Sequence, residues 1–305
     1  MDAYLTGVVP VVPTVFRDDE SVDLEGTARV VDYLIDAEAD GLCLLANYSE
    51  QFSLTDAERD TIARALLEHV AGRVPVIVTT SHYSARVAAR RSRAAQDMGA
   101  AVVMLMPPFF GAALTVPGPA VIEYFRQVTD AIDIPVMVQD APMSATPLPA
   151  GLLIDLVRQV PQVRYAKIEV PQAADKLHAL VSELGGSLPG PFDGEESVTL
   201  IPDLDAGAKG TMPSSMAAAE LGRIVRAYLA GDRPGAVRAW EDLLPLIHFE
   251  NRQCGLRAQK VLLREGGIIA SDKTRAPFGP VSPRTRRGLI ELAAARDLLV
   301  TRWAR

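Results

Sequence analysis

Short apolar segments alternate along this chain with longer amphipathic segments. The apolar segments carry β-branched or bulky residues on both faces, which is typical of parallel strands that are covered by helices. We predict strands at residues 7–16, 41–46, 75–80, 101–106, 134–139, 164–170, 189–193 and 208–212, of which 189–193 has the weakest pattern.

The segments between these strands carry helix signals. Thr55 and Glu58 form a capping-box pair, so a helix is predicted to begin there and to run through Ile62, Leu66 and Val70. Further helices are predicted after Asp23, Ser84, Pro117 and Pro149. Eight strands that each precede a helix favour an α/β fold of the closed (β/α)8 TIM barrel type, with a doubly wound open sheet as the alternative.

Strand patterns end near residue 217, whereas helical patterns continue to residue 305. No Gly/Ser-rich linker and no shift in composition separates the two regions. We therefore predict a barrel core at 1–216, followed at 217–305 by a helical extension that packs on the barrel.

The amino-acid composition and the net charge indicate which kind of molecule the protein binds. The 305 residues are 49% hydrophobic and 23% charged, with a net charge of −7. These values exclude a disordered or collagen-like chain and argue against nucleic-acid binding, so a small-molecule partner is expected. The chain starts without a signal-peptide pattern and contains no apolar run long enough to span a membrane, so we expect a cytoplasmic protein without membrane contact.

The sharpest chemical signal lies in the segment 164–170. Side chains alternate between the two faces of a strand, so Tyr165, Lys167 and Glu169 share one face, whereas Ala166 and Ile168 share the other. Because the apolar face must meet the helices, Lys167 and Glu169 are predicted to point into the barrel. A lysine that is partly removed from water has a lowered pKa and can supply the neutral amine that forms a Schiff base.

Two alternatives to this interpretation stay open. Lys167 and Glu169 would also fit a buried ion pair without chemistry. Lys209 is a second strand lysine, but it begins the last predicted strand and so lies nearer the bottom of the barrel.

Other polar residues also follow predicted strands, where barrel enzymes carry their sites. Asn47, Tyr48 and Ser49 suit a carboxylate or a plain turn, while Ser81 and His82 suit acid–base or structural roles. Acidic residues at the start of a helix interact favourably with the helix dipole, so the segment 193–196 does not require a metal ion. The sequence contains no metal-ligand spacing, GxGxxG fingerprint or phosphate loop, so neither a metal nor another cofactor is expected.

These features resemble the dihydrodipicolinate synthase and N-acetylneuraminate lyase superfamily. The resemblance covers essentially the whole chain and rests on the barrel pattern, on residues 41–50, on the strand-end lysine in 165–169 and on 207–210. It implies a Schiff base on Lys167 and a homotetramer. The superfamily's tyrosine in Tyr-Asn-x-Pro is replaced here by Gln139, which cannot act as an acid or a base.

One dehydratase subgroup of this superfamily shares these departures. The similar runs are 47–52, 78–84, 138–142, 167–169, 193–196 and 250–253. The resemblance implies dehydration of 2-keto-3-deoxy-L-arabonate to 2-oxoglutarate semialdehyde in non-phosphorylated pentose catabolism. It also implies catalytic roles for Lys167 and Glu169, and substrate binding by Asn47, Tyr48, Ser49, Ser81, His82, Gln139 and Gly194.

Three other functions stay open at this point. A Schiff-base aldolase would release pyruvate, and a decarboxylating dehydratase would act on a keto-deoxy-glucarate. An inactive barrel with a binding or regulatory role would form no adduct with any 2-keto acid.

Overall fold

The computed structural model describes residues 4–109 and 116–305, and the chain divides into two compact units. The first unit contains residues 4–6 and the described parts of Pro75–Glu195 and Thr199–Met212. The second contains Gly7–Val74, Glu196–Val198 and Pro213–Arg305. Each unit therefore combines segments that are distant in the sequence.

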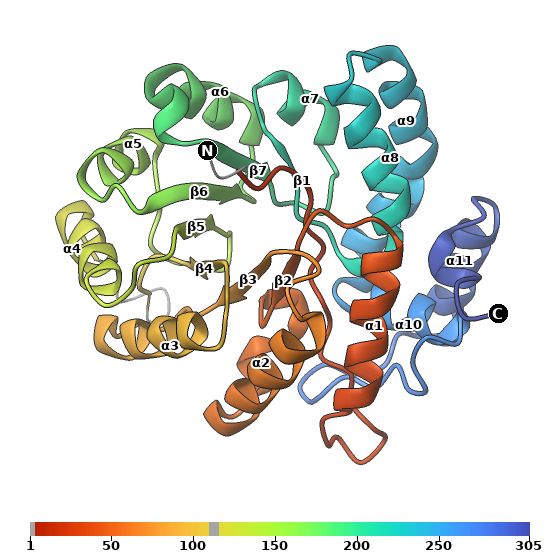
Figure 1. Ribbon diagram of the computed structural model, residues 1–305. Coiled ribbons are helices and arrows are strands. Elements are labelled where there is room, and N and C mark those ends of the chain that lie inside the picture. The colour runs from red at the N-terminus through yellow and green to blue at the C-terminus, as the bar shows by residue number, and fades with distance from the viewer. Residues whose placement is uncertain (1–3, 110–115) are drawn as a thin grey trace. The chain divides into compact units, whose positions relative to one another are not determined.

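The first unit alternates strands with helices. In chain order its elements are β3 (Val76–Thr79), α3 (Ala85–Asp97), β4 (Val102–Leu105), α4 (Gly118–Thr129), β5 (Val136–Asp140), α5 (Ala150–Gln159), β6 (Val163–Ile168), α6 (Ala173–Leu184), β7 (Gly190–Asp193), α7 (Leu200–Asp205) and β8 (Gly210–Thr211). Each strand pairs in parallel with the next along the chain. Figure 1 shows α3, α4, α5 and α6 on the outer side of these strands.

This layering explains the apolar character of the strands. Ile77, Val103, Met137 and Ala166 are completely buried, although neighbouring residues on a strand face opposite sides of the sheet. The helices cover the outer side and the side chains of the other strands fill the inner side. Both faces therefore require apolar residues along most of each strand.

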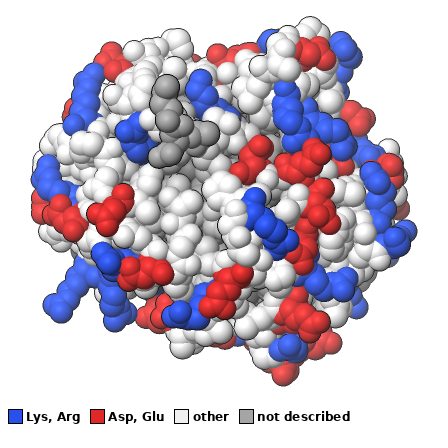
Figure 2. Space-filling view, in the orientation of Figure 1, with Lys and Arg blue, Asp and Glu red and all other residues white. Residues whose placement is uncertain are grey.

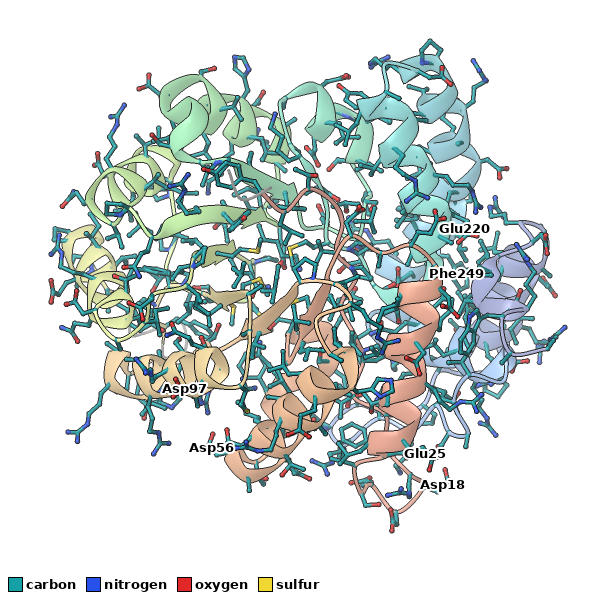
Figure 3. All side chains as sticks on the ribbon, in the orientation of Figure 1. Asp18, Glu25, Asp56, Asp97, Glu220 and Phe249 are labelled. Carbon is teal, nitrogen blue, oxygen red and sulfur yellow. The ribbon has the colours of Figure 1, made fainter. Side chains whose placement is uncertain are left out.

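The second unit contains the beginning and the end of the chain. Its elements are β1 (Gly7–Val8), α1 (Leu24–Asp36), β2 (Leu42–Leu44), α2 (Asp56–Val70), α8 (Ala218–Leu229), α9 (Arg233–Phe249), a π-helical segment (Glu250–Cys254), α10 (Arg257–Glu265) and α11 (Pro283–Ala294). Phe249, labelled in Figure 3, ends α9 and packs so closely on Gly288 of α11 that a Cβ there would lie 3.1 Å from its ring. The last helices thus pack on one another within this unit.

The sequence predicted these elements well. In the described residues, eight strands appear in the predicted order, each followed by a helix, which confirms the (β/α)8 fold. The capping box of α2 is also confirmed, because Thr55 Oγ1 accepts from the Glu58 N–H and Glu58 Oε2 accepts from the Thr55 N–H. The division into a core at 1–216 and an extension at 217–305 stays a prediction.

One strand is much shorter than predicted. We expected a strand at 7–16, but β1 covers only Gly7–Val8, and Val11 contributes isolated bridges to Cys43 and Ser214. Pro10 and Pro13 interrupt this segment. Because proline has no N–H to donate, it cannot continue the ladder of hydrogen bonds.

Charged side chains are mixed on the surface. On the face drawn in Figure 2, blue Lys and Arg side chains alternate with red Asp and Glu side chains rather than gathering by sign. Within residues 4–109 and 116–305, no helix is long and apolar enough to cross a membrane.

A buried pair of carboxyl groups links β7 to α7. Asp193 ends β7 and is completely buried, while Asp203 lies on α7 and is also buried. Thr211 Oγ1 donates to Asp193 at 2.5 Å and Thr199 Oγ1 donates to Asp203 at 2.7 Å. Burial, together with the negative charge of Asp203, raises the pKa of Asp193 to about 7.

We predict that this pair makes folding less favourable at alkaline pH. Since the folded state holds the Asp193 proton more tightly than the unfolded chain does, stability is lost as pH rises from about 4 towards 7. Asp203→Asn removes one charge and offers Asp193 an amide donor. Urea unfolding at pH 5 and pH 8 is expected to show a smaller loss of stability for this variant than for the wild type. Asp205→Asn, which changes an exposed carboxylate on the same helix, is the control; an unchanged pH dependence in Asp203→Asn would contradict the prediction.

Candidate active site

Lys167 and Glu169 meet at the end of β6. Lys167 Nζ lies 2.8 Å from Glu169 Oε1, and the two side chains are only 4% and 14% exposed. This contact agrees with the prediction that alternate residues of the strand share one face. Lys209, the competing lysine, precedes β8 and is exposed, so it lacks the buried setting of Lys167.

Gln139 brings a second donor to the same carboxylate. It lies on β5 in register with Lys167, is completely buried, and donates from Nε2 to Glu169 Oε1 at 2.7 Å. One oxygen of Glu169 thus receives hydrogen bonds from both neighbours, which fixes the carboxylate beside the amine. Among the described residues, Gln139 Oε1 has no hydrogen-bond donor, so the amide retains one acceptor inside the site.

Gly194 provides the space for this arrangement. Its N–H donates to Ile168 O at 2.9 Å, which brings the chain after β7 against the end of β6. A Cβ at this position would lie 2.5 Å from Glu169 Cγ and 2.7 Å from Lys167 Cγ. A side chain here would displace both residues, so the close approach requires glycine.

Asp140 and Lys176 support the site from the face of the sheet that is covered by helices. Asp140 O accepts from the Glu169 N–H at 3.0 Å, and the Asp140 carboxylate pairs with Lys176 Nζ of α6 at 2.5 Å. Burial raises the pKa of Asp140, and the hydrogen bond from Lys176 opposes that effect. Sequence reasoning did not identify Lys176 as a partner, although the rarity of lysine in this chain was a usable signal.

Ser81 and His82 follow β3 and are held by the backbone around them. Ser81 Oγ accepts from the Met106 N–H at 3.0 Å. His82 Nδ1 accepts from the Ser84 N–H at 3.0 Å, so a neutral ring carries its proton on Nε2. The His82 ring stacks on Tyr83 with 4.4 Å between ring centroids. Substrate binding by Ser81 and His82 stays a prediction.

Asn47, Tyr48 and Ser49 belong to the second unit, where they form a 3-10 turn after β2. Ser49 Oγ donates to Val12 O at 2.6 Å, and its N–H donates to Ala46 O at 2.9 Å. Asn47 Oδ1 accepts from Gln51 Nε2 at 2.7 Å. These bonds shape the turn itself, and its predicted role in carboxylate binding stays a prediction.

Sequence reasoning did not predict the burial of two ionisable residues of the second unit, Glu250 and Lys260. Glu250, in the π-helical segment, is completely buried, which raises its pKa to about 8, while a hydrogen bond with Ser214 lowers it. Lys260 of α10 is also completely buried and pairs with Glu50. Across the part of the chain that the structure describes, no three His, Cys, Asp or Glu side chains gather in a group that could hold a metal ion.

Comparison with known proteins adds independent evidence. The model of the dihydrodipicolinate synthetase family matches residues 4–295. The chain is 51% identical over 298 residues to L-2-keto-3-deoxyarabonate dehydratase of Azospirillum brasilense. The match covers 98% of this chain and 96% of that protein.

Solved structures agree over nearly the whole chain. YagE of Escherichia coli K12, a prophage protein solved in complex with pyruvate, superposes with a TM-score of 0.89 at 27% identity and covers 97% of this chain and 100% of that one. Dihydrodipicolinate synthase of Rhodopseudomonas palustris gives a TM-score of 0.87 at 26% identity over 95% of this chain and 97% of that one. From the match of the family model and the 51% identity, we conclude that the chain belongs to the dihydrodipicolinate synthetase family.

Proposed function

We propose that this protein is a Schiff-base lyase that dehydrates 2-keto-3-deoxy-L-arabonate to 2-oxoglutarate semialdehyde and water. The observation that carries the proposal is the buried contact of 2.8 Å between Lys167 Nζ and Glu169 Oε1. A nucleophilic amine and a proton carrier are thereby placed side by side. The 51% identity to a protein named for this dehydration supports the choice of substrate.

The first step forms the covalent intermediate. Lys167 must lose a proton before it can attack the ketone at carbon 2, and Glu169 is the acceptor in contact with it. Attack gives a carbinolamine, and Glu169 gives its proton to the departing hydroxyl group. Water then leaves, an iminium ion joins carbon 2 to Nζ, and Glu169 is again a carboxylate. The positive charge of this iminium makes the hydrogens on carbon 3 acidic.

Glu169 then carries one proton from carbon 3 to the departing hydroxyl group. Its carboxylate removes a proton from carbon 3, which converts the iminium to an enamine and leaves Glu169 protonated. The enamine expels the hydroxyl group on carbon 4, and Glu169 returns its proton to that group, so water departs. Protons then leave carbon 5 and its hydroxyl group while carbons 3 and 4 each take up one, which makes carbon 5 an aldehyde. A second water molecule hydrolyses the imine and frees Lys167.

Gln139 has a different task from the tyrosine that it replaces. An amide does not exchange protons at neutral pH, so Gln139 orients Glu169 through its Nε2 donor while its Oε1 acceptor is available to a substrate hydroxyl. Gly194 lets the substrate approach the Lys167–Glu169 pair. The sequence-based roles of the remaining residues complete the proposal, with Tyr48 and Ser49 binding the carboxylate and Asn47, Ser81 and His82 binding hydroxyls.

The proposed setting is cytoplasmic pentose catabolism without phosphorylated intermediates, with the enzyme acting as a homotetramer on a small sugar acid. This setting rests on the resemblance of the sequence to its family.

Borohydride trapping tests the proposed reaction directly. Incubation with 2-keto-3-deoxy-L-arabonate and reduction is expected to leave an adduct on the Lys167 peptide that has lost the carbon 4 hydroxyl, as measured by peptide mass mapping. Lys167→Met should abolish the adduct, whereas Lys209→Met, the control, should retain it. A pyruvate-sized adduct would indicate an aldolase, and no adduct with any 2-keto acid would indicate a non-enzymatic barrel.

Glu169→Gln is expected to separate covalent binding from turnover. The amide keeps the shape of Glu169 but cannot carry a proton. The Schiff base should still form, with solvent water accepting the Lys167 proton, while kcat falls by about 10²–10⁴-fold. Product formation and trapping measure the two quantities. Glu183→Gln, which alters an exposed carboxylate on α6, should behave like the wild type, and near-normal turnover in Glu169→Gln would remove Glu169 from its role.

Gly194→Ala is expected to disturb the active pair without unfolding the protein. The new methyl group would displace Glu169 and Lys167 from their positions, and we expect kcat/KM to fall by about 10²-fold. Gly151→Ala on α5 is the matched control, because a Cβ there meets nothing within 4 Å. Equal kinetics for the two variants would show that the close approach has no catalytic value.

A further inference from the structure

The segment from Leu45 to Glu50, which contains the Asn47–Ser49 turn, has an unfavourable backbone. Leu45 has φ of 57° and Glu50 has φ of 58°, so two residues with side chains occupy the left-handed region. Such conformations persist only where surrounding contacts enforce them. The contacts that hold this turn therefore decide its shape.

Lys260 of α10 holds one end of the turn. Its ammonium group donates to Glu50 Oε1, and both side chains are completely inaccessible to solvent. A second Lys260 bond goes to Lys273 O at 2.9 Å, and Glu50 Oε2 accepts from the Arg275 N–H at 3.0 Å. The Lys260 ammonium also lies 4.4 Å from the centre of the Phe16 ring.

Gln259, the preceding residue of α10, holds the middle of the turn. Its Nε2 donates to Tyr48 O at 2.9 Å. Its Oε1 accepts from the Ser215 N–H at 3.1 Å and from the Ser215 hydroxyl at 2.9 Å. Because Ser215 fixes which way the amide faces, the donor side of Gln259 must point towards the turn.

We infer that α10 acts as a template for the Asn47–Ser49 turn, and that Gln259 and Lys260 are positioning residues for recognition of the substrate carboxylate. Two consecutive side chains of one helix fix Tyr48 and Glu50, which flank Ser49 on both sides. The inference rests on the proposed function, in which this turn binds the carboxylate. It gives α10, a part of the C-terminal helical region, a task in substrate selection.

The chemistry of the contacts supports positioning rather than stability alone. Apolar side chains of similar volume stabilise a buried site as well as an ion pair does, so an ion pair is a costly way to hold a helix. Its advantage is direction, because a buried carboxylate and ammonium tolerate few relative arrangements. Here both directional contacts end on a strained turn.

The test compares a charged substrate analogue with a neutral one. Glu50→Gln/Lys260→Met removes both buried charges together, so that neither is left unpaired, and Gln259→Leu removes the other contact. Rates of borohydride trapping are measured with pyruvate and with pyruvamide, which lacks the carboxylate charge. Arg264→Met is the control, since Arg264 lies on the same helix with an exposed side chain that pairs with Asp272.

We expect the wild type and Arg264→Met to react faster with pyruvate than with pyruvamide. In both turn variants the ratio of the two trapping rates should fall by about 10- to 100-fold, because pyruvate reacts more slowly. Hydrogen exchange should rise in peptides that cover 45–50 and stay unchanged at 163–169. If the double variant does not fold, Gln259→Leu decides the outcome. A folded turn variant with wild-type preference and exchange would overturn the inference, whereas a wild type without any adduct would refute the proposed function itself.

Discussion

The burial of an amine beside a carboxylate is the constraint on which the site depends. Neither Lys167 nor Glu169 is stable alone in the interior, because each charge removed from water needs a partner. Their contact of 2.8 Å satisfies part of this need, and the amide of Gln139 satisfies more. In the proposed function, a proton passes directly between these two groups.

Parallel register determines which residues join this pair. Gln139, Lys167 and Phe192 lie opposite one another on β5, β6 and β7, so their side chains share the inner face. The adjacent row contains Asp140, Ile168 and Asp193, whose side chains face the helices. The ends of these three strands therefore direct one row of side chains to the inside and the next row towards the helices.

Burial is less unfavourable for the carboxyl group of Asp140 than for that of Asp193. Asp140 faces a cation on α6 at 2.5 Å, and this pairing partly offsets the cost of its burial. Asp193 faces a second carboxyl group on α7, and its raised pKa records a preference for holding a proton. Hydroxyl donors from Thr199 and Thr211 make this arrangement tolerable. The buried carboxyl pair at the end of β7 therefore makes the stability of the fold depend on pH.

The sequence by itself determined the elements and one face of the site. Short runs that are apolar on both faces located the strands, the capping box located the start of α2, and the two-residue period placed Lys167 and Glu169 together. These signals depend only on neighbouring residues. Only the tertiary structure decided their partners. Gln139 reaches Glu169 across 30 residues and Lys260 reaches Glu50 across 210, while Gly194 is needed for space that no local pattern reveals. Such contacts follow from strand register and helix packing, which local periodicity does not encode.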